Sequence, residues 1–189
     1  MRLVFALVLC AAFAAGGDAA LMRGVYVDGD SLAEGTAPYL PSLLPHWSLR
    51  QSYAVSRHVA EGVALLRAEA PRLEQVVVIS LGTNDDPRQV SEFKTGLRQI
   101  LAIAGPARCV VWTNIVRPPA AGASYDGYNR ALAAAAATHR NLLIVDWHAL
   151  VAGHPVWLRA DGVHATAAGY KARATAIAAA VEKCTSRLR

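Results

Sequence analysis

Five short apolar segments alternate along the chain with longer segments of helical periodicity. Branched residues predominate in the apolar segments, which are 25–28, 49–55, 76–81, 109–116 and 142–146. The segments with apolar positions three and four residues apart are 32–44, 58–70, 88–104, 125–138 and 166–184. Strands that alternate with helices predict right-handed crossovers and a mostly parallel sheet with helices on both faces.

The predicted strands differ in how polar they are. Four are almost continuously apolar, as buried strands of a parallel sheet are. Segment 49–55 contains Arg50, Gln51 and Ser52, and therefore predicts an edge strand. An open parallel sheet binds ligands beyond the carboxyl ends of its strands. The residues that follow the strands are therefore the first candidates for chemistry.

Composition indicates one globular domain. The 189 residues suffice for one well-filled core, and 54% hydrophobic with 17% charged residues exclude a disordered, collagen-like or coiled-coil chain. The formal net charge of +5 comes from basic residues scattered over many segments, without a basic arm or stripe. Binding to nucleic acid is therefore not expected.

Residues 1–19 differ from the rest of the chain. Met1-Arg2 is a short positive start, residues 3–15 are apolar or small, and Gly17-Asp18-Ala19 has small residues at both positions that determine cleavage. This pattern predicts a secretory signal peptide, followed by a mature domain 20–189. The apolar run is shorter than the roughly 20 residues that span a bilayer, so no stable membrane anchor is expected. We expect a secreted, periplasmic or cell-wall protein.

Two cysteines remain in the mature chain, Cys109 and Cys184. Export to an oxidising compartment would permit a disulfide between them, and two unpaired cysteines are the alternative. Because the closed loop is long, a disulfide would stabilise the fold by roughly 4 to 5 kcal/mol in the chain-entropy model.

Three polar motifs follow predicted strands. Gly29-Asp30-Ser31-Leu32 places a serine where a helix begins, near unpaired backbone N–H groups. Gly82-Thr83-Asn84-Asp85 can supply an amide donor to the same crevice. Asp161-Gly162-Val163-His164 lets a carboxylate accept from one imidazole nitrogen while the other faces a serine. Taken singly, each motif could instead be a helix cap or a turn.

With these motifs in this order, the mature chain resembles the GDSL/SGNH hydrolase family, which is named for an essential Ser, Gly, Asn and His. The resemblance implies a three-layer α/β/α domain with a five-stranded parallel sheet in the order 2-1-3-4-5. It also implies a serine esterase without metal or organic cofactor. Ser31 would be the nucleophile, His164 the base and Asp161 the acid that orients the histidine.

The resemblance further implies an oxyanion hole formed by the N–H groups of Ser31 and Ser56 and the side chain of Asn84. The family usually has a glycine where Ser56 stands here. If that position needs positive φ, serine has a conformational cost that glycine lacks. A lost oxyanion donor typically lowers turnover by about 100- to 1000-fold.

Three further residues fall in loops near the expected cleft: Asp85, Arg117 and Trp157. They are candidates for substrate contact, and the alternative is a surface charge or a packed aromatic ring. The short loops argue against a large lid and favour short acyl groups or an exposed polymer.

A narrower resemblance lies in Val145-Asp146-Trp147-His148, Gly153-His154, Trp157 and the last motif. These residues look like the extracytoplasmic SGNH domains of membrane acyltransferases that O-acetylate bacterial cell-wall polysaccharide. The implied substrate is a small-molecule or polysaccharide acyl ester, and a monomer is expected. Esterase and O-acetyltransferase differ only in whether water or a sugar hydroxyl attacks the acyl-enzyme.

Other classes remain as alternatives. Asp28-Gly29-Asp30, with Ser80 and Asp85-Asp86, resembles a haloacid-dehalogenase-type phosphatase that binds Mg²⁺, but this leaves Asn84 and the last motif unexplained. A catalytically weak binding module with the same fold is another alternative. A metal site is not expected at Asp146, His148 and His154, because two histidines six apart on a loop form no preformed tetrahedral set.

Overall fold

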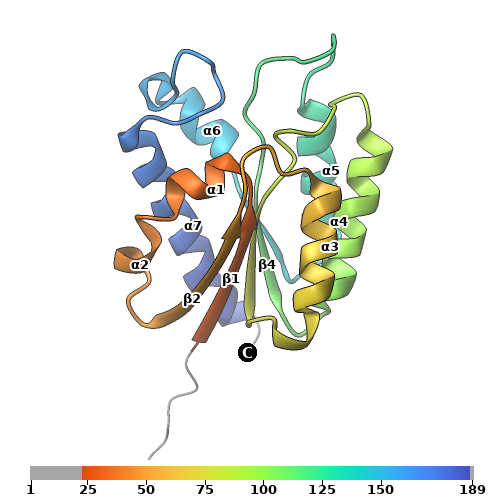
Figure 1. Cartoon of the computed structure of the whole chain (residues 1–189), viewed down its shortest axis with the longest axis vertical. Helices are drawn as coiled ribbons and strands as arrows, with labels where there is room; N and C mark the ends of the chain where they lie inside the picture. Colours follow the sequence, from red (N-terminus) through yellow and green to blue (C-terminus); the bar gives the residue numbers. More distant parts are fainter. Residues whose placement is uncertain (1–22, 188–189) are drawn as a thin grey trace, which may run out of the picture.

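The computed structural model describes residues 23–187, so the predicted signal peptide, residues 1–19, lies outside the described part. Five parallel strands form one sheet in the order β2-β1-β3-β4-β5, with helices on both faces (Figure 1). The predicted fold and strand order are therefore confirmed. The strands are β1 Arg23–Gly29, β2 Trp47–Tyr53, β3 Val76–Ser80, β4 Cys109–Thr113 and β5 Leu142–Val145.

Two layers of helices enclose the sheet, as Figure 1 shows. One face is covered by α3 (Val59–Glu69), α4 (Val90–Ala104) and α5 (Asp126–Thr138). The other layer contains α1 (Ser31–Thr36), α2 (Leu40–Leu43), α6 (Trp147–Ala152) and α7 (Ala167–Arg187). Short 3₁₀ turns at Ala70–Arg72 and Pro155–Trp157 complete the chain order.

Strand β3 shows why the central strands are apolar throughout. Successive side chains of a strand point to opposite faces of the sheet. Val77 and Ile79 pack among the residues of α3, α4 and α5, whereas Val76 and Val78 pack on the side of α7. Both faces of β3 are thus buried.

Strand β2 lies at the edge of the sheet and pairs with β1, as its polar residues predict. The Arg50 guanidinium lies over the Tyr26 ring, and it also pairs with Glu69 and Glu74. These charged contacts cover the outer strand with groups that tolerate water, which is one way in which natural sheets protect an edge.

Strand β2 begins and ends two residues earlier than predicted. The structure differs more clearly from the predicted elements in three further places. Segment 32–44 forms two short helices, α1 and α2, and Pro38 lies between them, where its missing N–H cannot continue a helix. The fourth strand ends at Thr113, three residues earlier than predicted, and a loop follows. Helix α6, directly after β5, is too short to show helical periodicity and was not predicted.

Cys109 and Cys184 form a disulfide that joins the start of β4 to α7. Both side chains are completely buried. Of the two arrangements that the sequence leaves open, the structure contains the bonded one. Among the helices of residues 23–187, none is both long enough and apolar enough to cross a membrane.

Candidate active site

Ser31 is the first residue of α1, directly after the carboxyl end of β1. The turn before it is held by the Asp30 N–H, which donates to the Ser80 carbonyl at 3.1 Å, and by the Asp30 carboxylate, which accepts from the Leu32 N–H at 2.9 Å. The Oγ of Ser31 lies 3.0 Å from Nε2 of His164. The hydroxyl therefore has a base within hydrogen-bonding distance.

His164 and Asp161 lie on one tight turn before α7. The Nδ1 of His164 lies 2.8 Å from Oδ2 of Asp161, and Oδ1 of Asp161 accepts from the N–H groups of Val163 and His164, both at 2.9 Å. Gly162 has φ +66°, a conformation that glycine adopts without strain. The hydrogen bonds that the Asp161 carboxylate accepts lower its pKa to about 2, so Asp161 stays ionised over the pH range in which most enzymes work.

Asn84 follows β3, and its side-chain amide points toward the turn Gly29-Asp30-Ser31-Leu32, here called the GDSL turn. Its Nδ2 donates to Oδ2 of Asp30 at 3.2 Å and to the carbonyl of Arg57 at 3.3 Å. Both distances are at the long end for N–H···O bonds, so these bonds are weak. The structure thus brings Ser31, His164, Asp161 and Asn84 together at the carboxyl edge of the sheet.

Ser56 lies in the loop between β2 and α3, with φ +62°. The position therefore has the left-handed conformation that glycine adopts more easily, which is the conformational cost anticipated for a serine there. Ser56 does not line the cleft beside Ser31. The next residue, Arg57, approaches the site through its carbonyl and anchors the loop through a 2.7 Å ion pair with the buried Asp28.

An open cleft of about 410 Å³ lies beside Ser31. Arg117 and the two prolines after it form one wall of the cleft. The Nη1 of Arg117 donates to the Thr83 carbonyl. Of the three predicted substrate-contact residues, only Arg117 lines this cleft. The lining residues are Ser31, Asn84, Arg117, Pro118, Pro119, Ala120, Asp161, Val163 and His164.

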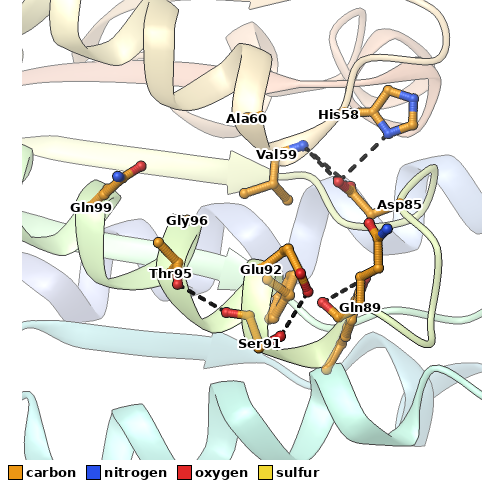
Figure 2. Close-up of a pocket in the computed structure, with 12 residues that line it drawn as sticks. His58, Val59, Ala60, Asp85, Gln89, Ser91, Glu92, Thr95, Gly96 and Gln99 are labelled. Carbon is orange, nitrogen blue, oxygen red and sulfur yellow. Dashed lines mark hydrogen bonds and ion pairs between the residues drawn. The ribbon is translucent and has the colours of Figure 1, made fainter.

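A larger hollow of about 520 Å³ lies between α3 and α4 (Figure 2), and Ser31 is not among the residues that line it. Asp85 lines this hollow, where it accepts from the Val59 N–H and lies 3.6 Å from His58. It also lines a neighbouring pocket that shares Asn84, Arg117 and Ala120 with the cleft. Burial raises the pKa of Asp85. We place the chemistry in the smaller cleft because it contains the serine and the histidine, whereas Asp85 holds the start of α3.

Trp157 also lies outside the lining of the cleft. Its ring stacks on His154 at 3.9 Å and parallel to Trp147 at 6.1 Å, between centroids. Its carbonyl accepts from the Thr166 N–H at 2.8 Å. Trp157 thus packs beside the loop that carries Asp161 and His164, which corresponds to the packed-aromatic alternative.

The acidic residues considered for metal binding have other partners. Asp28 pairs with Arg57, and Asp30 accepts from Leu32 and Asn84. Asp146 caps α6 and accepts from Asn114 at 2.7 Å. Over residues 23–187, no three His, Cys, Asp or Glu side chains cluster in a way that could hold a metal ion.

Solved structures share this fold. The C-terminal catalytic domain of peptidoglycan O-acetyltransferase A from Streptococcus pneumoniae is 22% identical (TM-score 0.72; 87% of this chain, 95% of that one). A family 3 carbohydrate esterase from Clostridium thermocellum is 15% identical (TM-score 0.68; 88% of this chain, 99% of that one). A GDSL-like lipase from Bacteroides thetaiotaomicron is 20% identical (TM-score 0.63; 86% of this chain, 89% of that one). Among curated protein sequences, none matches the chain.

The family comparison covers most of the domain. The model of the GDSL-like lipase/acylhydrolase family matches residues 27–172, which include the end of β1 with the Gly29-Asp30-Ser31-Leu32 turn, Asn84 and the turn with Asp161 and His164. The chain therefore belongs to the GDSL-like lipase/acylhydrolase family, the GDSL/SGNH type of carboxylic ester hydrolase.

Proposed function

We propose that this protein is a secreted serine esterase that cleaves short-chain acyl esters through an acyl-enzyme on Ser31. The observation that carries the proposal is the hydrogen-bonded series from Ser31 Oγ to His164 Nε2 at 3.0 Å and from His164 Nδ1 to Asp161 at 2.8 Å. It opens into a cleft large enough for a small ester. A nucleophile, a base and an orienting acid in such contact can support acyl transfer.

In the proposed reaction, Ser31 Oγ attacks the ester carbonyl while His164 Nε2 takes the hydroxyl proton. The resulting imidazolium is stabilised by the Asp161 carboxylate, which stays ionised because its pKa is about 2. His164 then returns the proton to the leaving alcohol. Water, activated by the same histidine, attacks the acyl-enzyme and releases the acid.

Three donors are proposed to stabilise the oxyanion. The Ser31 N–H belongs to the first turn of α1, where N–H groups have no acceptor within the helix. Asn84 Nδ2 would exchange its 3.3 Å bond to the Arg57 carbonyl for a bond to the oxyanion, while Asp30 continues to hold it. Ser56 is a proposed third donor, with the strain of its positive φ.

Replacing Asn84 with alanine is expected to lower kcat for p-nitrophenyl acetate by about 100- to 1000-fold, with a much smaller change in KM, because the amide acts mainly on the transition state. Asn141→Ala is the matched control, since its amide also donates to two backbone carbonyls but lies away from the cleft. A kcat for Asn84→Ala within threefold of wild type would contradict the oxyanion role.

Two features support a short acyl group. The cleft is open, and its apolar lining consists of compact residues, Pro118, Pro119, Ala120 and Val163, with no long apolar channel among them. Turnover should therefore fall from p-nitrophenyl acetate to butyrate to octanoate. Octanoate turnover equal to or above acetate turnover would overturn this part of the proposal.

The disulfide supports export, because disulfides persist in oxidising compartments and are rare in the cytosol. Together with the predicted signal peptide, it suggests a periplasmic, cell-wall or secreted location. Fractionation of cells that express the full chain tests this. We expect the cleaved, disulfide-bonded form outside the cytosol, and an uncleaved, reduced cytosolic form would contradict it.

Acetyl transfer is the second candidate function. It is favoured by the similarity to the peptidoglycan O-acetyltransferase domain and by an open cleft that a sugar hydroxyl could reach in place of water. Adding an oligosaccharide acceptor to the p-nitrophenyl acetate assay distinguishes the two. An esterase releases acetate in proportion to nitrophenol, whereas a transferase forms acetylated sugar and less acetate.

A further inference from the structure

A buried arginine lies at the carboxyl ends of β3 and β4. Arg173 on α7 is only 2% exposed. Its Nη2 donates to the hydroxyls of Ser80 at 2.9 Å and Thr113 at 2.6 Å, and its guanidinium lies 5.4 Å from the centre of the Trp147 ring. Within the described part of the chain, its Nε and Nη1 have no hydrogen-bond partner. A buried cation with unpaired N–H groups destabilises the fold unless negative charge compensates it.

Ser80 connects Arg173 to Asp30: its hydroxyl accepts from Arg173 Nη2 at 2.9 Å, and its carbonyl accepts from the Asp30 N–H at 3.1 Å. The Asp30 carboxylate, which is completely buried, is therefore a negative charge near the guanidinium. Burial raises the pKa of Asp30, and the nearby positive charge of Arg173 opposes this rise. Burial likewise lowers the pKa of Arg173 to about 10, opposed by Asp30. Each group therefore favours the ionised form of the other.

The state of Asp30 matters because of what its two oxygens hold. Oδ1 accepts from the Leu32 N–H in the turn that presents Ser31, and Oδ2 accepts from Asn84 Nδ2. An ionised carboxylate only accepts hydrogen bonds, so it can hold both donors. A protonated carboxyl has an O–H donor on one oxygen, which would face a donor and displace it.

From this arrangement we propose that Arg173 is a positioning residue for the oxyanion hole: its charge keeps Asp30 ionised, and ionised Asp30 holds the Asn84 amide in place. The inference rests on the proposed role of Asn84 in ester cleavage. The hydrogen bonds of Arg173 go to Ser80 and Thr113, neither of which lines the cleft, so in this proposal it acts through Asp30.

Other titratable groups also face Asp30. Asp28, on β1 two residues before Asp30, repels it but is itself paired with Arg57 at 2.7 Å. Tyr170, one helical turn before Arg173, is a buried phenol whose raised pKa keeps it neutral. His164 lies beyond Ser31, at 3.0 Å from its Oγ. Among these groups, Arg173 is the cation that counters the burial of Asp30 inside the fold.

The test compares Arg173→Met and Arg173→Lys, with p-nitrophenyl acetate as substrate and pH varied from 4 to 9. Loss of the charge in Arg173→Met should lower kcat by about 10- to 100-fold, which is less than the loss expected when an oxyanion donor is removed outright. KM should stay within threefold of the wild-type value. The acid limb of kcat should move to higher pH, because the pKa of Asp30 rises further without the cation. Arg173→Lys keeps the charge and should recover most of kcat.

Asp30→Asn separates this role from a purely structural one, because asparagine cannot titrate. In the Asp30→Asn background, Arg173→Met should lower kcat by less than threefold and leave the acid limb unchanged. Equal loss of kcat in both backgrounds, an unmoved acid limb, or a lysine variant no better than methionine would overturn the proposal.

Arg173→Gln serves if the methionine variant does not fold, since glutamine is neutral but can still bond to Ser80 and Thr113. The results expected of Arg173→Met, and those that would overturn the proposal, apply equally to Arg173→Gln. Failure of the proposed esterase function is distinguishable from failure of this inference, because the wild-type protein itself would then show no Ser31-dependent hydrolysis.

Discussion

Replacing His164 with alanine is expected to reduce kcat for p-nitrophenyl acetate by on the order of 10⁵- to 10⁶-fold, because Ser31 would lose the base that activates it. The imidazole is the link between the hydroxyl and the carboxylate, at 3.0 Å from one and 2.8 Å from the other. The fold should persist, since this side chain is 38% exposed. Initial rates and thermal unfolding measured on the same preparation check both expectations.

Two variants make this result specific. Asp161→Asn should lower kcat by about 10⁴-fold, because the histidine would be held in the wrong tautomer while the geometry stays intact. His139→Ala, an exposed histidine at the end of α5, should change kcat by less than twofold. If His164→Ala keeps more than a hundredth of the wild-type kcat, the proposed acyl-transfer mechanism is wrong.

Removing the Cys109–Cys184 disulfide is expected to lower the free energy of unfolding by roughly 4 to 5 kcal/mol. The cysteines are 75 residues apart, and in the chain-entropy model a loop of that length restricts the unfolded chain by about this amount. For a domain of this size, each kcal/mol corresponds to about 2 to 4 °C in Tm. The Cys109→Ala/Cys184→Ala variant, compared with wild type by urea unfolding, measures the effect.

The control for this prediction is a reductant. Dithiothreitol should destabilise the wild type toward the level of the double variant and leave the double variant unchanged. Esterase activity at low temperature should survive, because the disulfide joins the amino end of β4 to α7, far from the carboxyl edge where Ser31 lies. Equal stability with and without the disulfide would show that it does not constrain the unfolded chain.

Sequence patterns predict the sheet well because its strands are buried on both faces. The continuous apolar run of β3 and the polar interruption in β2 directly reflect their central and edge positions. The helices α1, α2 and α6 are less predictable, since each has only four to six residues. Such short helices are defined by caps, prolines and tertiary contacts rather than by a periodic apolar face.

The local parts of the site are also visible in the sequence. Asp161 and His164 lie three residues apart on one turn, so their contact is short-range, and the strand ends bring Ser31 and Asn84 to the same edge. The loop paths are not visible in the sequence. It therefore does not show that Asp85 lines the pocket next to the cleft, or that Trp157 stacks on His154, rather than lining the cleft itself.

Long-range contacts account for what sequence reasoning missed. Arg57 reaches back to Asp28 across 29 positions, and Arg173 reaches Ser80 across 93. Neither arginine belongs to one of the three motifs, and an isolated arginine in a sequence is usually a surface charge. Only the packing of α7 against the sheet shows that Arg173 is buried at the carboxyl ends of β3 and β4.

The most direct test of the central claim is hydrolysis of p-nitrophenyl acetate by the mature protein and by Ser31→Ala, both with EDTA present. We predict turnover by the wild type that survives EDTA and vanishes in the variant, together with a covalent organophosphonate adduct on Ser31 in the intact mass. Equal turnover by the wild type and the Ser31→Ala variant, or wild-type activity that EDTA abolishes, would contradict a serine esterase.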